Sequence, residues 1–329
     1  MSTVLLPAPG AEAAAELFAT HLRAGSSDEV RVARVEFRRF PDGEAYLRLL
    51  DSVAGTHAWV VGTLRDPDPQ ALTLLFLADA ARELGAASVG LAAPYLPYMR
   101  QDARFKDGEA ITSRTFARIV SQAFDRLVTV DPHLHRYPSL DAVYRIPSAV
   151  APSAPAIARW ISQRLPRPVV IGPDGESEQW ARDVAARVGC PVLVLAKQRL
   201  GDRSVEISLP QAAGLADRQP VLIDDIISSA RTMATAVRHV RAAFGRAPVC
   251  VGVHAVLAPD AMDVLREAGA AKVVTCNTLT MVEGAIDVFG ELAAAATGLA
   301  LQLNTAGGMP SAGDGSRRSP ISANINQGS

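Results

Sequence analysis

Short apolar runs alternate with amphipathic stretches along most of the chain. Runs rich in Val, Ile and Leu predict buried strands, and apolar residues spaced three and four positions apart predict helices. The predicted strands span residues 3–6, 30–37, 46–50, 57–62, 88–93, 127–130, 169–172, 192–195, 205–208, 221–223, 249–256 and 273–276. The predicted helices span residues 11–23, 71–84, 111–124, 156–165, 179–188, 232–243, 261–268 and 285–299. This order favours α/β architecture, with mostly parallel sheets flanked by helices.

The alternation restarts after residue 147, which divides the chain into two similar halves. Each half contains a strand that runs directly into an acid, Asp131 in the first and Asp224 in the second. We therefore expect tandem α/β domains over residues 1–148 and 149–303, followed by a disordered tail over residues 304–329. The tail is expected to be disordered because it is rich in Gly, Ser, Asn and Pro. In such sheets ligands bind beyond the carboxyl ends of the strands.

The composition excludes several classes of function. The chain has 49% hydrophobic residues and a net charge of −1, so there is no electrostatic case for binding nucleic acid or an anionic membrane. No uninterrupted apolar run reaches the ~18–20 residues of a membrane span, and the N-terminus lacks the pattern of a secretory signal. Cys190, Cys250 and Cys276 are odd in number and widely spaced, which indicates buried thiols of a reducing cytoplasm.

Two adjacent acids, Asp224 and Asp225, follow the apolar run at residues 221–223. Carboxylates at the end of a buried strand are costly unless they bind hydroxyls, a metal or another partner. Ser228, Ser229 and Thr232 follow near the start of a predicted helix, where hydroxyls and backbone N–H groups bind anions. Acids suited to the hydroxyls of a sugar, next to a site suited to phosphate, predict a sugar-phosphate site.

The segment from residue 221 to residue 232 resembles the phosphoribosyl-diphosphate (PRPP) binding motif of the type I phosphoribosyltransferase fold. More narrowly, it is similar to the version found in the ribose-phosphate diphosphokinases, the PRPP synthetases. The resemblance implies two tandem type I phosphoribosyltransferase-like domains. It also implies that the paired acids hold the ribose hydroxyls. The residues implied to bind ribose 5-phosphate are Asp224, Asp225, Ser228, Ser229, Ala230, Arg231 and Thr232.

Two segments of the N-terminal half separate the synthetases from the phosphoribosyltransferases, which have no matching half. Taken alone, Phe40-Pro41-Asp42-Gly43-Glu44 predicts a hairpin turn, and residues 94–109 predict a solvated charged loop. Together they resemble the ATP site of the PRPP synthetases. The residues implied to bind ATP are Phe40, Asp42, Glu44, Arg100, Gln101 and Asp102. In that family the two segments often come from different subunits, which implies a homo-oligomer, a dimer or a hexamer.

His133 and His135 lie two positions apart after a predicted strand, so in an extended chain both point to one side. Such a pair can hold a metal, although two ordinary histidines in a loop are more common. The resemblance implies that His133 and Asp174 bind the Mg²⁺ of Mg-ATP, and it gives no counterpart for His135. The run Gly175-Glu176-Ser177 departs from the family, which has a more Gly-rich turn there.

Lys197 and Arg199 follow the predicted strand at residues 192–195. Taken alone they indicate a basic hairpin of the kind found on many protein surfaces. The PRPP synthetases carry a Lys-x-Arg pair here, on a loop that closes over ATP. Since the protein's part in phosphoryl transfer is mainly to position groups and offset charge, the resemblance makes Lys197 and Arg199 the catalytic cations.

Arg231 replaces a glycine of the family's PRPP loop, where a Cβ crowds the 5-phosphate or demands a different φ, and where the guanidinium could equally add a phosphate ligand. The retained cations and paired acids favour an active enzyme that converts ATP and ribose 5-phosphate into AMP and PRPP for nucleotide biosynthesis. Two alternatives stay open, a regulatory paralogue with weak or no activity and a phosphoribosyltransferase. The leading interpretation requires the paired aspartates to face a cleft shared with the histidine-bearing loop.

Overall fold

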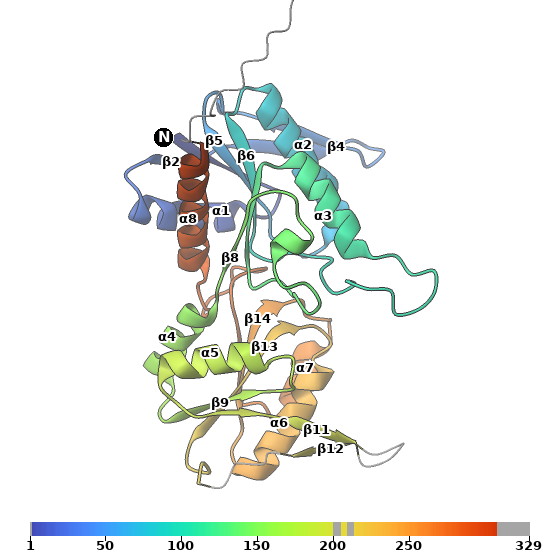
Figure 1. Cartoon of the computed structure of the whole chain (residues 1–329), viewed down its shortest axis with the longest axis vertical. Coiled ribbons are helices and arrows are strands. Elements are labelled where there is room, and N and C mark those ends of the chain that lie inside the picture. The colour runs from blue at the N-terminus through green and yellow to red at the C-terminus, as the bar shows by residue number, and fades with distance from the viewer. Residues whose placement is uncertain (1, 200–204, 209–213, 308–329) are drawn as a thin grey trace, which may run out of the picture.

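Two parallel sheets, one in each half of the chain, organise the fold (Figure 1). The computed structural model describes residues 2–199, 205–208 and 214–307. Helices pack on both sheets, so the expected α/β architecture is confirmed. Parallel neighbours need crossover connections, which explains why a helix separates most consecutive strands of each sheet.

The first sheet has the strand order β2-β1-β5-β6-β7-β8, and every neighbouring pair is parallel. Its strands are β1 (Ser2–Pro7), β2 (Glu29–Val32), β5 (His57–Val61), β6 (Ser88–Ala93), β7 (Arg126–Val130) and β8 (Ser148–Ala151). The helices between them are α1 (Glu12–Gly25), α2 (Pro67–Glu83), α3 (Thr112–Ala123) and the short 3-10 helix η1 (Leu140–Ala142). The central strands are buried on both faces, as expected for a parallel sheet covered by helices.

The second sheet has the strand order β10-β9-β13-β14-β15, again with parallel neighbours throughout. Its strands are β9 (Pro168–Gly172), β10 (Val192–Val194), β13 (Gln219–Ile227), β14 (Val249–Ala255) and β15 (Lys272–Thr275). Its helices are α4 (Ala154–Arg164), α5 (Glu178–Val188), α6 (Arg231–Phe244) and α7 (Ala261–Ala268). Every residue of β14 is buried, so both faces of this strand are covered by packed side chains.

The strand that carries the paired acids is longer than the sequence predicts. Pairing with β14 does not stop at Ile223 but continues through Asp224 to Ile227, which lies opposite Ala255. The ladder hydrogen bonds of β14 therefore hold the acids inside β13, where the sequence pattern ended the strand before them. Both acids are consequently positioned by a sheet and not by a loop.

Two antiparallel hairpins lie outside the sheets. One joins β3 (Val35–Arg39) to β4 (Ala45–Leu49), and the other joins β11 (Ala196–Arg199) to β12 (Val205–Ser208). The single strand predicted over residues 30–37 is wrong, because β2 ends at Val32 in the first sheet and β3 begins a separate hairpin. The sequence also did not predict the short edge strand β8.

The last helix, α8 (Phe289–Gly307), returns to the first half of the chain and packs on α1 and β8 (Figure 1). The ring of Phe289 lies 6.4 Å from that of Phe18 on α1. The expected domain boundary falls at the first residue of β8, which pairs in the first sheet. We propose to draw the division after β8 and to count α8 with the first half. Residues 304–307 continue α8, and the remainder of the expected tail lies outside the described residues.

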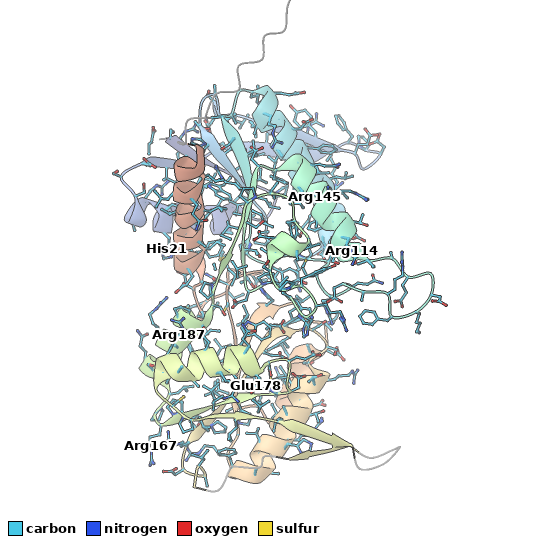
Figure 2. All side chains as sticks on the ribbon, in the orientation of Figure 1. His21, Arg114, Arg145, Arg167, Glu178 and Arg187 are labelled. Atoms are coloured by element: carbon cyan, nitrogen blue, oxygen red, sulfur yellow. The ribbon has the colours of Figure 1, made fainter. Side chains whose placement is uncertain are left out.

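Charged side chains such as Arg167, Glu178 and Arg187 lie on the outside of the second half (Figure 2). On α5, Glu178 pairs with Arg182 and Asp183 with Arg187, each four residues apart. Exposed pairs of this kind contribute less than about 1 kcal/mol each, so burial of the apolar cores dominates the stability. Among the described helices, none combines the length and the apolar character that crossing a membrane requires.

Candidate active site

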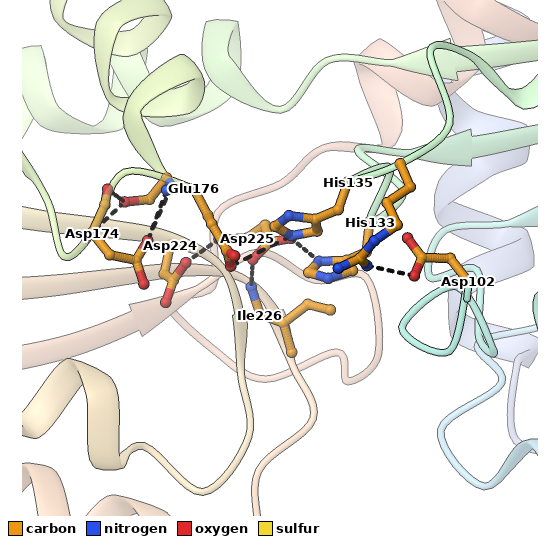
Figure 3. Close-up of polar contacts among 10 residues, drawn as sticks. Asp102, His133, His135, Asp174, Glu176, Asp224, Asp225 and Ile226 are labelled. Carbon is orange, nitrogen blue, oxygen red and sulfur yellow. Dashed lines mark hydrogen bonds and ion pairs between the residues drawn. The ribbon is translucent and has the colours of Figure 1, made fainter. Parts of the chain in front are cut away.

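A pocket lies between the two halves, at the carboxyl ends of β7, β9 and β13 (Figure 3). The first half contributes Arg100 and the loop after β7, and the second half contributes the loop after β9 and the end of β13. The lining residues are Arg100, His133, His135, Asp174, Glu176, Asp224, Asp225 and residues 226–233. The paired aspartates and the histidine-bearing loop therefore share one cleft.

A direct contact between His133 and Asp225 joins the two halves inside the pocket. The Nδ1 atom of His133 lies 2.6 Å from a carboxylate oxygen of Asp225. The histidine loop begins at Asp131, whose φ of 29° lies in the left-handed region. The Asp131 carboxylate accepts hydrogen bonds from the Ser153 backbone N–H, at 2.9 Å, and from the Ser153 hydroxyl, at 2.5 Å. These bonds hold the strained turn that directs His133 toward β13.

His254, near the end of β14, supports the same loop from the second half. Its Nε2 lies 3.1 Å from the backbone carbonyl of Asp131, and its Nδ1 lies 3.0 Å from the Thr278 hydroxyl. Burial lowers the pKa of His254 to about 4, so the ring is neutral at physiological pH. In the neutral ring, Nε2–H donates to the Asp131 carbonyl, while the Thr278 hydroxyl beside Nδ1 donates to the Val253 carbonyl at 3.1 Å. His254 therefore fixes the distance between the histidine loop and the acidic strand.

The two neighbouring aspartates have different electrostatic environments. Burial, followed by the charges of Asp225 and Asp174, raises the pKa of Asp224 to about 8. Burial also opposes ionisation of Asp225, but the hydrogen bond and charge interaction with His133 outweigh it and lower the pKa of Asp225. At neutral pH the pair therefore holds one proton, on Asp224, and one negative charge, on Asp225.

Asp174 stands in the turn that precedes α5. Its carboxylate accepts hydrogen bonds from the backbone N–H groups of Glu176, at 3.1 Å, and Ser177, at 3.2 Å. The Ser177 hydroxyl donates to the Asp174 carbonyl at 2.8 Å. Residues 175–177 thus form an ordered turn into α5 although Gly175 is their one glycine. The turn directs Glu176 toward His135, with 3.8 Å between a carboxylate oxygen and Nε2.

The loop from residue 228 to residue 232 closes the pocket at the N-terminus of α6. Ala230 has a φ of 59° and is the left-handed residue of this loop, while Arg231 is the first residue of the helix. The unusual backbone conformation expected at Arg231 is therefore located one residue earlier. The Arg231 side chain is exposed and lies 3.9 Å from Asp260. The first backbone N–H groups of α6 remain available to an anion.

The residues expected to bind ATP are not all brought to this pocket. The turn at residues 40–44 closes the β3–β4 hairpin, and Phe40 packs against Tyr46 with ring centroids 6.0 Å apart. None of that turn lines the pocket described above. Of the second segment, Arg100 lines the pocket and Gln101 accepts a hydrogen bond from Thr112 at 3.4 Å. Asp42 and Glu44 lie in the same turn, where the Glu44 backbone N–H donates to the Asp42 carboxylate at 3.1 Å.

The carboxylate of Asp102 is buried (Figure 3), and one of its oxygens lies 2.7 Å from the guanidinium of the exposed Arg136 side chain. Its other oxygen is buried and accepts no hydrogen bond from the residues that the structure describes. The ion pair of Asp102 with Arg136 therefore links residues 94–109 to the histidine loop, and Asp102 is not among the residues that line the pocket.

Lys197 and Arg199 lie on β11, opposite Ile207 and Val205 of β12. Their side chains fall outside the part of the chain that the structure describes. The hairpin follows the carboxyl end of β10. The pocket lies at the carboxyl ends of the parallel strands of this sheet.

Sequence reasoning missed several residues that build the site. His135 and Glu176 line the pocket, Arg136 pairs with Asp102, and His254 supports the loop at Asp131. The His-x-His spacing had indicated His135 as half of a pair that can hold a metal, but the resemblance gave it no role. The others depend on contacts between segments far apart in the sequence, for which no local pattern exists.

Both halves of the chain match known protein families. Residues 8–123 match the N-terminal domain of ribose phosphate pyrophosphokinase, and residues 139–291 match the phosphoribosyl transferase domain. The ribose-phosphate pyrophosphokinase of Saccharolobus solfataricus is 32% identical over 257 residues, covering 77% of this chain and 87% of the relative. That of Methanothermobacter thermautotrophicus is 34% identical over 246 residues, covering 74% and 85%.

The solved structure of phosphoribosylpyrophosphate synthetase from Mycobacterium smegmatis has the same fold. It superimposes with a TM-score of 0.77 at 24% identity, covering 93% of this chain and all of the other. With two tandem domains and relatives that match most of its length, the chain belongs to the ribose-phosphate pyrophosphokinase family.

Proposed function

We propose that this protein transfers the diphosphoryl group of Mg-ATP to the 1-hydroxyl of D-ribose 5-phosphate, giving PRPP and AMP. In this reaction the sugar oxygen bonds to the β-phosphorus, the bond from that phosphorus to the oxygen bridging the α-phosphate breaks, and the hydroxyl proton is lost. The observation that carries the proposal is the 2.6 Å contact between His133 and Asp225. It brings a metal-ligand candidate from the first half against the sugar-phosphate motif of the second.

The end of β13 and the start of α6 suit ribose 5-phosphate. The carboxyl groups of Asp224 and Asp225 line the pocket and offer acceptors to the 2- and 3-hydroxyls. Ser228, Ser229 and Thr232, with the backbone N–H groups of the loop, would hold the 5-phosphate at the N-terminus of α6. These contacts hold the sugar with its 1-hydroxyl free to attack.

The donor atoms of the pocket fit a divalent metal. Carboxylates of Asp174 and Asp224 line it together with His133, and Mg²⁺ prefers oxygen ligands while keeping several waters. His133 and Asp174 are our candidates for ligands. When bound, Mg²⁺ would offset the negative charge of the ATP phosphates.

The adenine and its phosphates would be bound by the turn at residues 40–44 and by Arg100 and Gln101, with Asp102 holding their loop in place through its ion pair with Arg136. Arg100 already lines the pocket, and its guanidinium suits phosphate oxygens. The turn stands outside the pocket of its own chain, which favours its use by the pocket of a neighbouring subunit. We infer that the enzyme works as a homo-oligomer, a dimer or a hexamer.

Lys197 and Arg199 are the candidate catalytic cations, because they follow β10, whose carboxyl end lies at the same edge of the parallel sheet as those of β9 and β13. Two positive charges near the diphosphoryl group would stabilise the charge that develops on it and on the departing AMP. Replacing Lys197 with Ala is expected to lower kcat by about a hundredfold or more, while the melting temperature stays the same. A kcat within threefold of the wild type would contradict this role. Arg203→Ala, four residues after Arg199 in the sequence, is the matched control.

One assay separates the candidate functions. The protein is incubated with Mg-ATP and ribose 5-phosphate, and the products are identified by mass spectrometry. AMP and PRPP in equal amounts support the diphosphokinase. Tight binding of ATP without product would support a regulatory paralogue, and conversion of added PRPP and a nucleobase into a nucleotide would support a phosphoribosyltransferase.

The cysteines favour a reducing compartment, and we propose the cytoplasm. Cys250 and Cys276 are buried, Cys190 is half-buried, and all three are free thiols. Burial raises the pKa of Cys250 to about 12, which keeps that thiol protonated and unreactive.

A further inference from the structure

The histidine that follows His133 by two residues points to a more specific metal site. We propose that His133, His135 and Asp225 together bind a first-row transition-metal dication such as Mn²⁺ or Co²⁺, and that His135 makes this site favour such ions over Mg²⁺. The proposal deepens the proposed function, and it rests on that function only for what the metal does during the reaction.

The geometry brings three donor groups to one point. One potential ligand atom from each of His133, His135 and Asp225 lies within 4.8 Å of the other two. The two imidazole rings have centroids 3.9 Å apart, so both face the same part of the pocket. The side chains of His133 and His135 are 20% and 21% exposed, which leaves room for an ion to enter from the pocket.

The surroundings of these rings are those of a metal-binding histidine pair. The Nδ1 atom of His133 lies 2.6 Å from Asp225, and Nε2 of His135 lies 3.8 Å from Glu176. At 2.6 Å, Nδ1 of His133 and the Asp225 oxygen are close enough to bind one ion together in place of a shared proton. Glu176, which is not one of the three ligands, lies beside His135 and helps to orient that ring. Asp174 lines the same pocket and adds a carboxylate that favours a cation.

The donor types determine which cation fits. Mg²⁺ requires nearly octahedral oxygen coordination and gives up water reluctantly, whereas imidazole suits Mn²⁺, Co²⁺ and Zn²⁺. A site with one histidine and carboxylates serves Mg²⁺ adequately. A second imidazole adds a nitrogen ligand that benefits a transition metal and gives Mg²⁺ little. His135 is therefore the residue on which the preference depends.

The test measures metal binding without nucleotide or sugar. Metal-free full-length protein is titrated with Co²⁺, followed by visible absorption, and with Mg²⁺, followed by calorimetry. Because many oxygen sites also bind Co²⁺ more tightly than Mg²⁺, the decisive comparison is between the wild type and His135→Asn. We expect the variant to bind Co²⁺ on the order of ten- to a hundredfold more weakly, while its Mg²⁺ affinity changes less than about threefold.

A spectroscopic count of ligands gives a second readout. Pulsed electron paramagnetic resonance of bound Mn²⁺ should detect two imidazole nitrogens in the wild type and one in His135→Asn. The matched control is His239→Asn, which removes a histidine on α6 that does not line the pocket. Circular dichroism confirms that both variants fold, and His135→Gln replaces His135→Asn if that variant does not.

The proposal is overturned if His135→Asn binds Co²⁺ as the wild type does, or if Mn²⁺ shows fewer than two nitrogen ligands. The synthesis of PRPP is assayed separately with Mg²⁺. Metal binding through both histidines without PRPP formation would end the proposed function but leave the metal site standing. PRPP formation together with unchanged Co²⁺ binding in His135→Asn would support the proposed function and end the proposed metal site.

Discussion

At the scale of single residues, the centre of the site is the pair Asp224 and Asp225. Successive side chains of a strand point to opposite faces, so only Asp225 meets His133 while Asp224 stands in the field of Asp174. One carboxyl group is thereby kept protonated and the other charged. Two identical residues side by side can then act differently, one as a hydrogen-bond donor or acceptor for a sugar and the other as an anion facing a metal.

The protonated state of Asp224 predicts an unusual pH dependence of the metal-free protein. The pKa is about 8 in the folded state and 3.8 for an unperturbed aspartate, so the folded state holds a proton that the unfolded chain has lost. Stability from this group therefore falls as pH rises toward 8. Between pH 6 and 8, the melting temperature of the wild type should fall by about 2–5 °C relative to Asp224→Asn.

The measurement is differential scanning fluorimetry in the presence of a chelator. Asp263→Asn, at an exposed side chain on α7, is the control and should follow the wild type. Parallel curves for the wild type and Asp224→Asn would show that Asp224 titrates normally.

Ala230 predicts a gain in stability from a single substitution. A residue with a Cβ pays about 1–2 kcal/mol for the left-handed conformation that glycine adopts freely, and glycine loses about 0.5–1 kcal/mol through its flexibility in the unfolded chain. Ala230→Gly should therefore raise the free energy of unfolding by up to about 1 kcal/mol, measured by urea denaturation. A loss of stability in this variant would mean that Ala230 does not hold a positive φ.

At the scale of elements, β13 and β14 both pack in the second core and carry side chains of the candidate site. β13 carries both aspartates, and β14 carries His254, which reaches across to the carbonyl of Asp131. The loop after β7 is thus bound at Asp131 from both sides, by Ser153 and by His254. A site made from the ends of two sheets is rigid only if such ties fix one sheet against the other.

His254→Ala tests this tie. Loss of the ring leaves a cavity and an unpaired carbonyl, so the free energy of unfolding at pH 7 should fall by about 2–4 kcal/mol. In the wild type, the pKa of His254 drops from 6.5 to about 4 on folding. The unfolded chain therefore takes up a proton between pH 6.5 and 4 that the folded chain does not, and this contribution to wild-type stability is lost as pH falls.

The difference between the wild type and His254→Ala should accordingly shrink as the pH is lowered toward 4. Chemical denaturation at a series of pH values measures it, and His239→Ala on α6 serves as the control. A difference that is constant with pH would show that His254 is not buried in its neutral form.

At the scale of the whole molecule, local patterns predicted the alternation of strands and helices and the strand-to-acid junctions. They succeeded because parallel strands buried on both faces read as continuous apolar runs. They failed where pairing partners decide the outcome. The division of residues 30–37 between β2 and β3, the edge strand β8 and the extension of β13 through its acids all depend on distant strands.

The candidate site shows the same division between local and distant information. The paired aspartates, the loop at residues 228–232, His133 and Asp174 came from motifs, and the structure brings them to one pocket. The pairing of Asp102 with Arg136 and the return of α8 to the first half had no local signal. The turn at residues 40–44 does not line the pocket of its own chain, which supports the proposal that a neighbouring subunit completes the ATP site.

The most direct test of the account follows the phosphorus atoms. The wild-type protein is mixed with Mg-ATP and ribose 5-phosphate, and the reaction is followed by ³¹P nuclear magnetic resonance. We predict that the ATP signals decline while AMP and a sugar diphosphate with a retained 5-phosphate appear in equal amounts, with no ADP. Formation of ADP and a singly phosphorylated 1-hydroxyl, or no reaction by a folded protein that binds both substrates, would contradict it.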